Sequence, residues 1–467
     1  MLYSSSEGGK RFNKSSIALV TCDETATADV IVELNPEIVW QTIKGFGGCI
    51  TDATALNYAS LNNTKLKKHF IESYCSNKGL EYSMLRIPIG GTEFSTRGYG
   101  YNMLPVNDTA LSNFSLAYED TEYKIPLIKA CMKKSNHSSI KMLASLWSPP
   151  AWMKTNNAYN GFGWLKEEYY QTLADYFYKF MKAYKKKGIS MWGVTITNEP
   201  INGIATARER NSLGWTIDQM NKWLTKHLSP TLRNSTSDFK DVLILANDDN
   251  RQWIPLFYNL MLKTFPEFFN HMDGVAVHSY DDDNVPPTVL QKCMAKSPNR
   301  FLLTTEGSII PSKMGEDPVV AVDYGSWNRA EKYINYIMEN LNYNSTGWMD
   351  LNMALNTEGG PSWLDFQQDA PIIVDADAGE FIKQPMYYAM GHFSKFIPPG
   401  ASRINATMSS DNGDVQNVAF ITPSDTIVAV VYNAAKVEKS VSVRLNGNEA
   451  AISLGARTIT TVEFPSC

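Results

Sequence analysis

Residues 191–200 read MWGVTITNEP, a short run of apolar and β-branched residues that ends in Asn198 and Glu199. A run of this length that is closed by polar residues is typical of a buried strand in a parallel sheet. The segment RFLLTTEGS at 300–308 repeats the pattern and ends with Glu306. The chain on either side of these two runs decides the architecture, because strands that alternate with helices build parallel βα units.

Outward from these runs, short apolar segments alternate with longer helical patterns between about residues 42 and 355. The amphipathic stretches 167–187 and 216–232 are examples of the expected helices. A doubly wound sheet is the alternative, but its Gly-rich phosphate turn is represented only by the weak G-x-G-G of residues 45–48. Eight βα units therefore predict a (β/α)8 TIM barrel in the α/β class, with strands at 42–50, 83–89, 141–147, 191–198, 242–247, 274–280, 300–306 and 347–354.

The two chain ends have a different pattern. After about residue 398, four segments alternate apolar and polar residues with period two and are separated by Asn, Gly, Asp and Ser turns. The segments SIALVTC at 16–22 and ADVIVEL at 28–34 have the same pattern. We therefore expect the barrel to span 42–397, and a β-sandwich to be built from 1–41 together with 398–467.

Composition and charge exclude several classes of protein. The 467 residues are 43% hydrophobic and 19% charged, which is a globular composition rather than a disordered or fibrous one. The net charge of -5 gives no basic field for a nucleic-acid partner. No run approaches the ~20 apolar residues of a transmembrane segment, and residues 1–16 lack the apolar core of a signal peptide.

Cysteines and glycosylation motifs bear on the compartment. The six cysteines include no C-x-x-C pair, so we expect neither a zinc site nor a dense disulfide framework, and we interpret the cysteines as buried free thiols. Eight Asn-x-Ser/Thr motifs suggest passage through the secretory pathway, and they begin at Asn13, Asn62, Asn107, Asn113, Asn136, Asn234, Asn344 and Asn405.

The two strand-terminal glutamates suggest glycoside hydrolysis. That reaction uses one carboxyl group to protonate the leaving oxygen and another to attack the anomeric carbon. A lone glutamate after an apolar run is more often a helix cap or a surface ion pair, but two in corresponding places favour the catalytic interpretation. An amide such as that of Asn198 can bind a sugar 2-hydroxyl, and the rings of Trp147, Trp152 and Tyr280 can stack on a sugar face or pack the barrel rim.

A series of ordered motifs resembles the glucosylceramidase family of glycoside hydrolases. The similarity extends from about Gly45 to Arg403 and is far more specific than any single motif in it. It is carried by GFGGCITDATALN at 45–57, LRIPIGGTEFSTR at 85–97, LASLWSPPAWMKTN at 143–156, TNEP at 197–200, TTEGS at 304–308, MALNTEGGPSW at 353–363 and KQPMYYAMGHFSKFIPPGASR at 383–403.

The resemblance implies a fold, a reaction and a set of site residues. It implies a (β/α)8 barrel with a β-sandwich, no metal or other cofactor, and cleavage of β-glucosides of ceramide with retention through a covalent glycosyl-enzyme. By resemblance, Glu199 is the acid/base and Glu306 the nucleophile. Four further residues match positions beside the sugar or the nucleophile, namely Asn198, Trp147, Tyr280 and the arginine Arg86, while His278 matches a supporting position.

Three residues depart from the family pattern at positions that hold the outer hydroxyls of the sugar. Glu93 replaces an aspartate and moves its carboxylate by one methylene, Leu351 replaces a tryptophan, and Ser362 replaces an asparagine. The departures put the preference for glucose in doubt more than the type of reaction. A β-glycosidase acting on another sugar, such as a β-xyloside, or on a non-lipid glucoside therefore stays open, as does a catalytically weak carbohydrate- or lipid-binding protein.

The resemblance also implies partners and a location. The family acts on glycolipids, with a saposin-type activator and an acidic membrane surface as partners, in the lysosome or outside the cell. Family members carry a leader and a Cys-rich stretch before the first β segment, and this chain starts inside that segment. We therefore expect the start of the chain to be incomplete.

Overall fold

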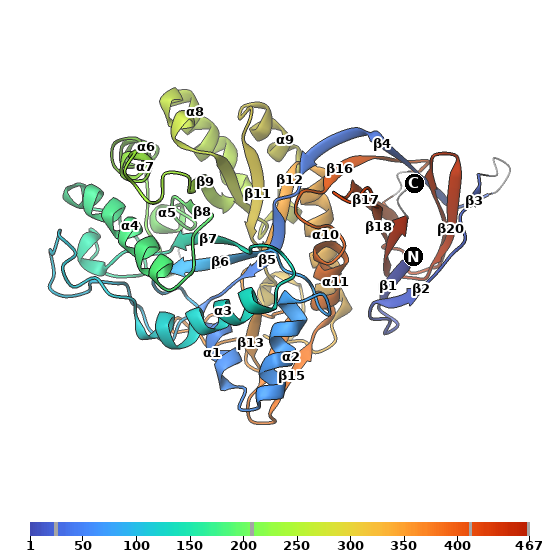
Figure 1. The fold of residues 1–467 in the computed structure, drawn as a ribbon, viewed down its shortest axis with the longest axis horizontal. Coiled ribbons are helices and arrows are strands. Elements are labelled where there is room, and N and C mark those ends of the chain that lie inside the picture. Colours follow the sequence, from blue (N-terminus) through green and yellow to red (C-terminus); the bar gives the residue numbers. More distant parts are fainter. Residues whose placement is uncertain (23–26, 206–209, 411–412, 465–467) are drawn as a thin grey trace.

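The computed structural model describes residues 1–22, 27–205, 210–410 and 413–464. Eight parallel strands close into a barrel in the order β10-β11-β12-β5-β6-β7-β8-β9 (Figure 1). The predicted (β/α)8 barrel is confirmed, and the doubly wound alternative is wrong because the sheet closes. The barrel strands are β5 (Gly45–Cys49), β6 (Met84–Ile89), β7 (Lys141–Leu146), β8 (Gly193–Thr195), β9 (Leu243–Asn250), β10 (Gly274–His278), β11 (Phe301–Glu306) and β12 (Ser345–Asp350).

Apolar side chains fill the inside of the barrel, as in other barrels of this kind. Met84, Leu143, Leu245 and Leu303 belong to one buried cluster to which different strands each contribute a side chain. The glycines of β5 allow close packing between strands. A Cβ atom at Gly47 would lie 1.9 Å from the carbonyl oxygen of Met84 on β6, so this glycine is required for the approach of β5 to β6.

Helices surround the barrel, and both expected helical stretches are confirmed. In α4, the side chains of Leu173, Phe177, Phe180 and Tyr184 recur three or four residues apart and are buried. The stretch that starts at Thr216 opens with a capping box and continues through α7. The helices are α1 (Asp52–Ser60), α2 (Thr64–Cys75), α3 (Ile125–Lys134), α4 (Tyr170–Lys186), α5 (Asn202–Ala205), α6 (Ile217–Trp223), α7 (Ser229–Arg233), α8 (Asn259–Thr264), α9 (Thr288–Ala295), α10 (Trp327–Asn342) and α11 (Pro385–Ser394).

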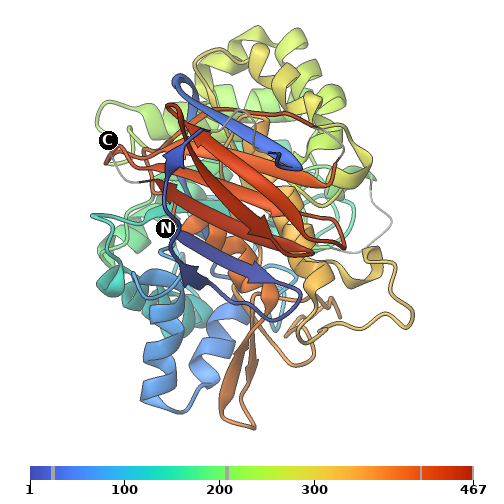
Figure 2. The ribbon, with the colours of Figure 1, turned by 90° about the vertical axis from the view of Figure 1, so that its right-hand side faces the viewer.

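Strands from both chain ends form the predicted β-sandwich, in the sheet order β2-β1-β21-β18-β17-β16-β4-β19-β20-β3. Figure 2 shows the N-terminal and C-terminal strands side by side on one flank of the barrel. Val32, Val431 and Val443 belong to its separate apolar core. The strands are β1 (Leu2–Ser6), β2 (Asn13–Ser15), β3 (Val20–Thr21), β4 (Val30–Thr42), β16 (Ser402–Met408), β17 (Val415–Ile421), β18 (Ile427–Asn433), β19 (Lys439–Leu445), β20 (Asn448–Leu454) and β21 (Thr458–Phe464).

Some strands were not expected from the sequence. The segments of β1 and β2 are short and polar, and β1 is held as a strand by pairing with β21 from the other chain end. The expected strand at 16–22 is reduced to Val20–Thr21. A small three-stranded sheet also follows the barrel, made of β13 (Ala354–Asn356), β14 (Ile372–Asp375) and β15 (Glu380–Lys383). Over the described ranges, we find no helix with the length and apolar character needed to cross a membrane.

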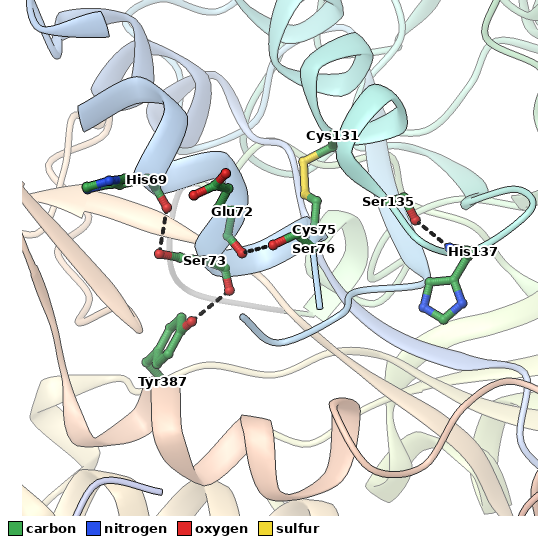
Figure 3. The surroundings of a disulfide bond; sticks show 9 residues. All are labelled: His69, Glu72, Ser73, Cys75, Ser76, Cys131, Ser135, His137 and Tyr387. Atoms are coloured by element: carbon green, nitrogen blue, oxygen red, sulfur yellow. Dashed lines mark hydrogen bonds between the residues drawn. A yellow bond between two sulfur atoms is a disulfide. The ribbon is translucent and has the colours of Figure 1, made fainter. Parts of the chain in front are cut away.

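One disulfide corrects the expectation of free thiols. Cys75 at the end of α2 is bonded to Cys131 in α3, with Cα atoms 5.3 Å apart (Figure 3). The two residues are 56 positions apart in the chain and meet because α2 packs on α3, which the spacing of the cysteines does not reveal. Cys49 and Cys293 are buried free thiols as expected, and Cys22 is a partly exposed one. Cys467 lies outside the described residues.

Candidate active site

The two predicted glutamates meet at the carboxyl-terminal mouth of the barrel. Glu199 follows β8 and Glu306 ends β11. One carboxylate oxygen of each, together with a ring nitrogen of His278, lie within 4.8 Å of one another. Retaining glycosidases hold their carboxyl groups about 5–5.5 Å apart, whereas inverting enzymes need about 6.5–9.5 Å to admit a water. The spacing is therefore that of a retaining pair.

Glu306 is held by two hydrogen-bond donors. The buried guanidinium of Arg86 donates to one oxygen of its carboxylate, and the hydroxyl of Tyr280 donates to the other at 2.8 Å. Arg86 also donates to the side-chain oxygen of Asn198 and to the carboxylate of Asp248, both at 2.8 Å. Burial alone would lower the pKa of Arg86, but the charges of Asp248 and Glu306 raise it. Arg86 therefore stays cationic and fixes the orientation of the Glu306 carboxylate.

Glu199 is paired with a histidine. Nδ1 of His278 lies 2.9 Å from one carboxylate oxygen of Glu199, Asn250 donates to the same oxygen at 3.3 Å, and Asn202 donates to the other. Although burial opposes both ionisations, the surrounding carboxylates raise the pKa of His278 to about 10, and the protonated His278 holds the pKa of Glu199 down at about 2. One proton is therefore available to the pair, and the surrounding charges favour its position on the imidazole.

Asp248 is a member of the site that was not expected from the sequence. It lies at the end of β9, fully buried, and accepts from Arg86 and from Ser145 at 2.8 Å. Nε2 of His278 lies 3.2 Å from its other oxygen. Burial would raise the pKa of Asp248, but the charge of Arg86 and the bond to His278 lower it. The polar run at 247–250, directly after the apolar residues 242–246, is the signal in the sequence that could have identified it.

The aromatic and acidic residues expected around the sugar lie beside this network. Trp147, Tyr280 and Leu351 belong to one buried cluster, and the guanidinium of Arg86 lies 4.6 Å from the ring centre of Trp147. Glu93 is buried nearby. Burial is the largest contribution that raises its pKa to about 8, and the charges of Glu199 and Glu306 add to it. The structure thus gathers these residues beside the carboxylate pair.

The structure gives the contacts of two further residues named in the sequence analysis. Trp152 packs edge-on against Tyr169 and donates its indole N–H to a backbone carbonyl, contacts that favour rim packing among the two roles left open for it. The hydroxyl oxygen of Ser362 accepts from the backbone N–H groups of Leu364 and Phe366 at 3.2 and 3.1 Å. Ser362 therefore stabilises its own turn, and this explains why a short polar residue fits there.

A cavity of about 440 Å³ opens beside the carboxylate pair, a size that suits a small-molecule site. Glu199, Tyr280 and Trp253 line it together with several polar side chains. A second cavity of about 340 Å³ adjoins it, and both cavities include Arg210 and Ile310 in their walls. The barrel and the two carboxylates within 4.8 Å define the protein as a glycoside hydrolase.

The chain belongs to glycosyl hydrolase family 30. The TIM-barrel domain of that family matches residues 43–397, and its beta sandwich domain matches residues 400–462. These matches confirm the family relationship that the motifs indicated.

Individual relatives agree with this assignment. Lysosomal acid glucosylceramidase from Mus musculus is 41% identical over 436 residues, which cover 92% of this chain and 82% of that protein. The solved structure of SrfJ from Salmonella typhimurium superposes with a TM-score of 0.89 at 26% identity and covers 99% of this chain and 98% of its own. The structure of an endo-β1,6-glucanase shares the fold, with a TM-score of 0.85 at 24% identity over 99% of this chain and 98% of that one.

Proposed function

We propose that this chain is a β-glucosidase that cleaves glucosylceramide, or a closely related glucosylated lipid, with retention of anomeric configuration. The observation that carries the proposal is the separation of at most 4.8 Å between carboxylate oxygens of Glu199 and Glu306. The similarity of the chain to a lysosomal glucosylceramidase supports the choice of substrate.

The reaction takes place in two steps. In the first, Glu306 attacks the anomeric carbon while the proton shared by Glu199 and His278 passes through Glu199 to the leaving oxygen. The glycosyl–Glu306 ester forms and the alcohol leaves. In the second, Glu199 removes a proton from water, which attacks the anomeric carbon and releases Glu306. Asn198 uses its oxygen to accept from Arg86, so its amide NH₂ is left to bind the sugar 2-hydroxyl.

Substrate profiling tests the proposal. We expect hydrolysis of a short-acyl glucosylceramide, of n-octyl β-glucoside and of an aryl β-glucoside, and NMR during the reaction should detect β-glucose before mutarotation. Initial release of α-glucose would exclude retention. Turnover of β-xylosides alone would favour the altered-sugar alternative, and binding without turnover would favour the carbohydrate-binding alternative.

The departures from the family pattern at Leu351 and Ser362 lead to a prediction on sugar specificity. We expect Leu351→Trp, alone and with Ser362→Asn, to raise kcat/KM on a β-glucoside about five- to hundred-fold relative to a β-xyloside, since each buried hydroxyl that gains a partner is worth roughly 1–3 kcal/mol. Leu351 contacts the cluster of Trp147 and Tyr280, so it should contribute more than Ser362. An equal change on both sugars would mean that these positions do not bind the sugar.

The proton shared by Glu199 and His278 predicts a pH effect. With a pKa raised to about 10, His278 keeps the pair protonated through neutral pH. In His278→Asn, Glu199 must hold the proton alone, and a carboxyl group loses its proton at lower pH than the pair with His278 does. The alkaline limb of kcat/KM should therefore move to lower pH by at least about one unit. His271→Asn, at a partly buried histidine bonded to Ser229, is the control. An unchanged alkaline limb would contradict the shared proton.

A lipid surface is the proposed site of action. Leu104, Phe162 and Val319 are 72%, 53% and 55% exposed, and they lie on loops that follow β6, β7 and β11, on the same side of the barrel as the carboxylates. Exposed apolar side chains around a site suit contact with a membrane. Activity on glucosylceramide in vesicles should therefore increase with acidic lipid and with a saposin-type activator, and activity independent of both would exclude these partners.

Lysosomal residence as a glycoprotein is proposed on two observations. A disulfide persists in oxidising compartments, and the motif residues Asn113 and Asn234 are exposed. When the protein is expressed through a secretory pathway, N-glycosidase treatment should lower its mass, and Asn113→Gln with Asn234→Gln should remove part of that change. An unchanged mass after treatment would exclude glycosylation.

A further inference from the structure

Arg210 lies in the wall shared by the two cavities at the mouth of the barrel. Its guanidinium is stacked over the ring of Phe366, 4.8 Å from the ring centre. Stacking covers the flat face of a guanidinium and leaves its N–H groups free to donate in the plane. The side chain is therefore held at the edge of the site without its donors being used by the ring.

The donors of Arg210 have no hydrogen-bond acceptor among the residues that the structure describes. Burial lowers the pKa of Arg210, but the nearby charges of Glu199 and Glu93 raise it, so the group stays cationic. A partly buried cation whose donors meet no acceptor within the described ranges is costly unless water or a ligand accepts from it.

The backbone around Arg210 is anchored. The N–H of Gly161 donates to the carbonyl of Arg210 at 3.1 Å, and Asn211 donates to the carbonyl of Gly91 at 3.2 Å. Ser212 accepts at its carbonyl from the buried ammonium of Lys154 at 2.6 Å. The guanidinium is thus presented to the cavities from a fixed stretch of chain, which is what a binding residue requires.

The chemistry of the cavity indicates what Arg210 binds. Glu199 lines the same cavity, so this cavity lies on the side of the leaving group. Lys313 and Asp281 form an ion pair at 2.7 Å in the cavity wall and cancel each other, and Glu93 is largely protonated below pH 8. Around the site three other cations face three carboxylates, and this balance favours neutral oxygen acceptors over an anion. These groups are Arg86, His278 and Arg210 against Glu199, Glu306 and Asp248.

We propose that Arg210 is a specificity-determining residue that donates hydrogen bonds to hydroxyl or amide oxygens of the leaving group, next to the glycosidic bond. The inference rests on the proposed function, and it adds that the enzyme recognises the polar oxygens of the leaving group. A glucoside whose aglycone carries such oxygens gains these bonds, whereas a glucoside of a plain alkyl chain does not.

The test compares two substrates with the same sugar in the full-length enzyme. Short-acyl glucosylceramide carries hydroxyl and amide oxygens near the glycosidic bond, and n-octyl β-glucoside carries none in its aglycone. Arg210→Met keeps a long apolar side chain on Phe366 and removes every donor. Arg210→Lys keeps the positive charge but loses the planar guanidinium with its several N–H donors. Arg300→Met is the matched control, because Arg300 is stacked on Phe269, 4.2 Å from its centre, where β11 begins.

Arg210→Met should lower kcat/KM on the glucosylceramide about ten- to hundred-fold more than on the octyl glucoside. Only the glucosylceramide has aglycone oxygens that accept hydrogen bonds from the charged Arg210, so only this substrate loses those bonds. Arg210→Lys should lie between, and Arg300→Met should change neither ratio. Equal losses on both substrates, or no loss on either, in a variant with an unchanged melting temperature would overturn the assignment. Because turnover of octyl glucoside tests the β-glucosidase activity separately, failure of the inference is distinguishable from failure of the proposed function.

Discussion

Glu306→Gln is expected to lower kcat on an aryl β-glucoside by at least about a thousandfold, which corresponds to roughly 4 kcal/mol of activation free energy. An amide oxygen is a poor nucleophile, and the glycosyl-enzyme cannot form without the carboxylate. The substitution also leaves Arg86 and Tyr280 facing a neutral amide instead of a charged partner. Steady-state kinetics on the purified variant, with its folding checked by circular dichroism, measures the effect.

A matched control separates chemistry from folding. Glu331, which accepts from Tyr432 and Arg457 between the barrel and the sandwich, is partly buried and remote from the site. Glu331→Gln should keep kcat within about threefold of the wild-type value, as substitutions away from the reacting groups do. If Glu306→Gln retained a tenth of the wild-type kcat, another group would have to be the nucleophile.

Glu199→Ala is expected to give a loss that depends on the leaving group. On an alkyl glucoside, which needs protonation of its leaving oxygen, kcat/KM should fall at least about a thousandfold, whereas on a dinitrophenyl glucoside it should change little. The second step then becomes slow for every substrate, because no base activates water. Removal of the side chain opens space beside His278 and Asn250, and added azide should enter it, restore turnover and give the β-glycosyl azide.

The configuration of the azide product distinguishes the two glutamates. Azide that attacks the glycosyl-enzyme gives the β-product in Glu199→Ala, whereas azide that replaces the nucleophile in Glu306→Ala gives the α-product. NMR of the isolated azides identifies each one. An α-azide from Glu199→Ala would reverse the proposed roles.

Much of the barrel could be predicted because each strand is a local pattern. The length of the apolar runs at 191–198 and 300–306, and the polar residues that end them, are visible in the local sequence. Both strands and both glutamates could therefore be predicted. The strand β1 could not be predicted in this way, since it is polar and exists only through pairing with β21. The Cys75–Cys131 bond depends likewise on how α2 and α3 pack.

Within the site, individual residues were predicted better than their connections. Arg86 and His278 were expected near the carboxylates, but their common partner Asp248 was not, because its role requires three strands to be brought together. The charges around His278 favour its protonated form and hold Glu199 ionised, and no sequence pattern contains that balance of charges. Ser362 replaces an asparagine of the family pattern with a shorter group, and the sequence did not show that its oxygen accepts two hydrogen bonds within its own turn.

Covalent trapping identifies the nucleophile. A glucose-configured epoxide is opened by the nucleophile of a retaining β-glucosidase and stays attached, so peptide mass spectrometry identifies the residue. We expect one adduct per chain, on Glu306, formed with loss of activity, prevented by a competing β-glucoside and absent in Glu306→Gln. An adduct on another residue, or continued turnover of β-glucosides by an enzyme that the epoxide does not label, would contradict this expectation.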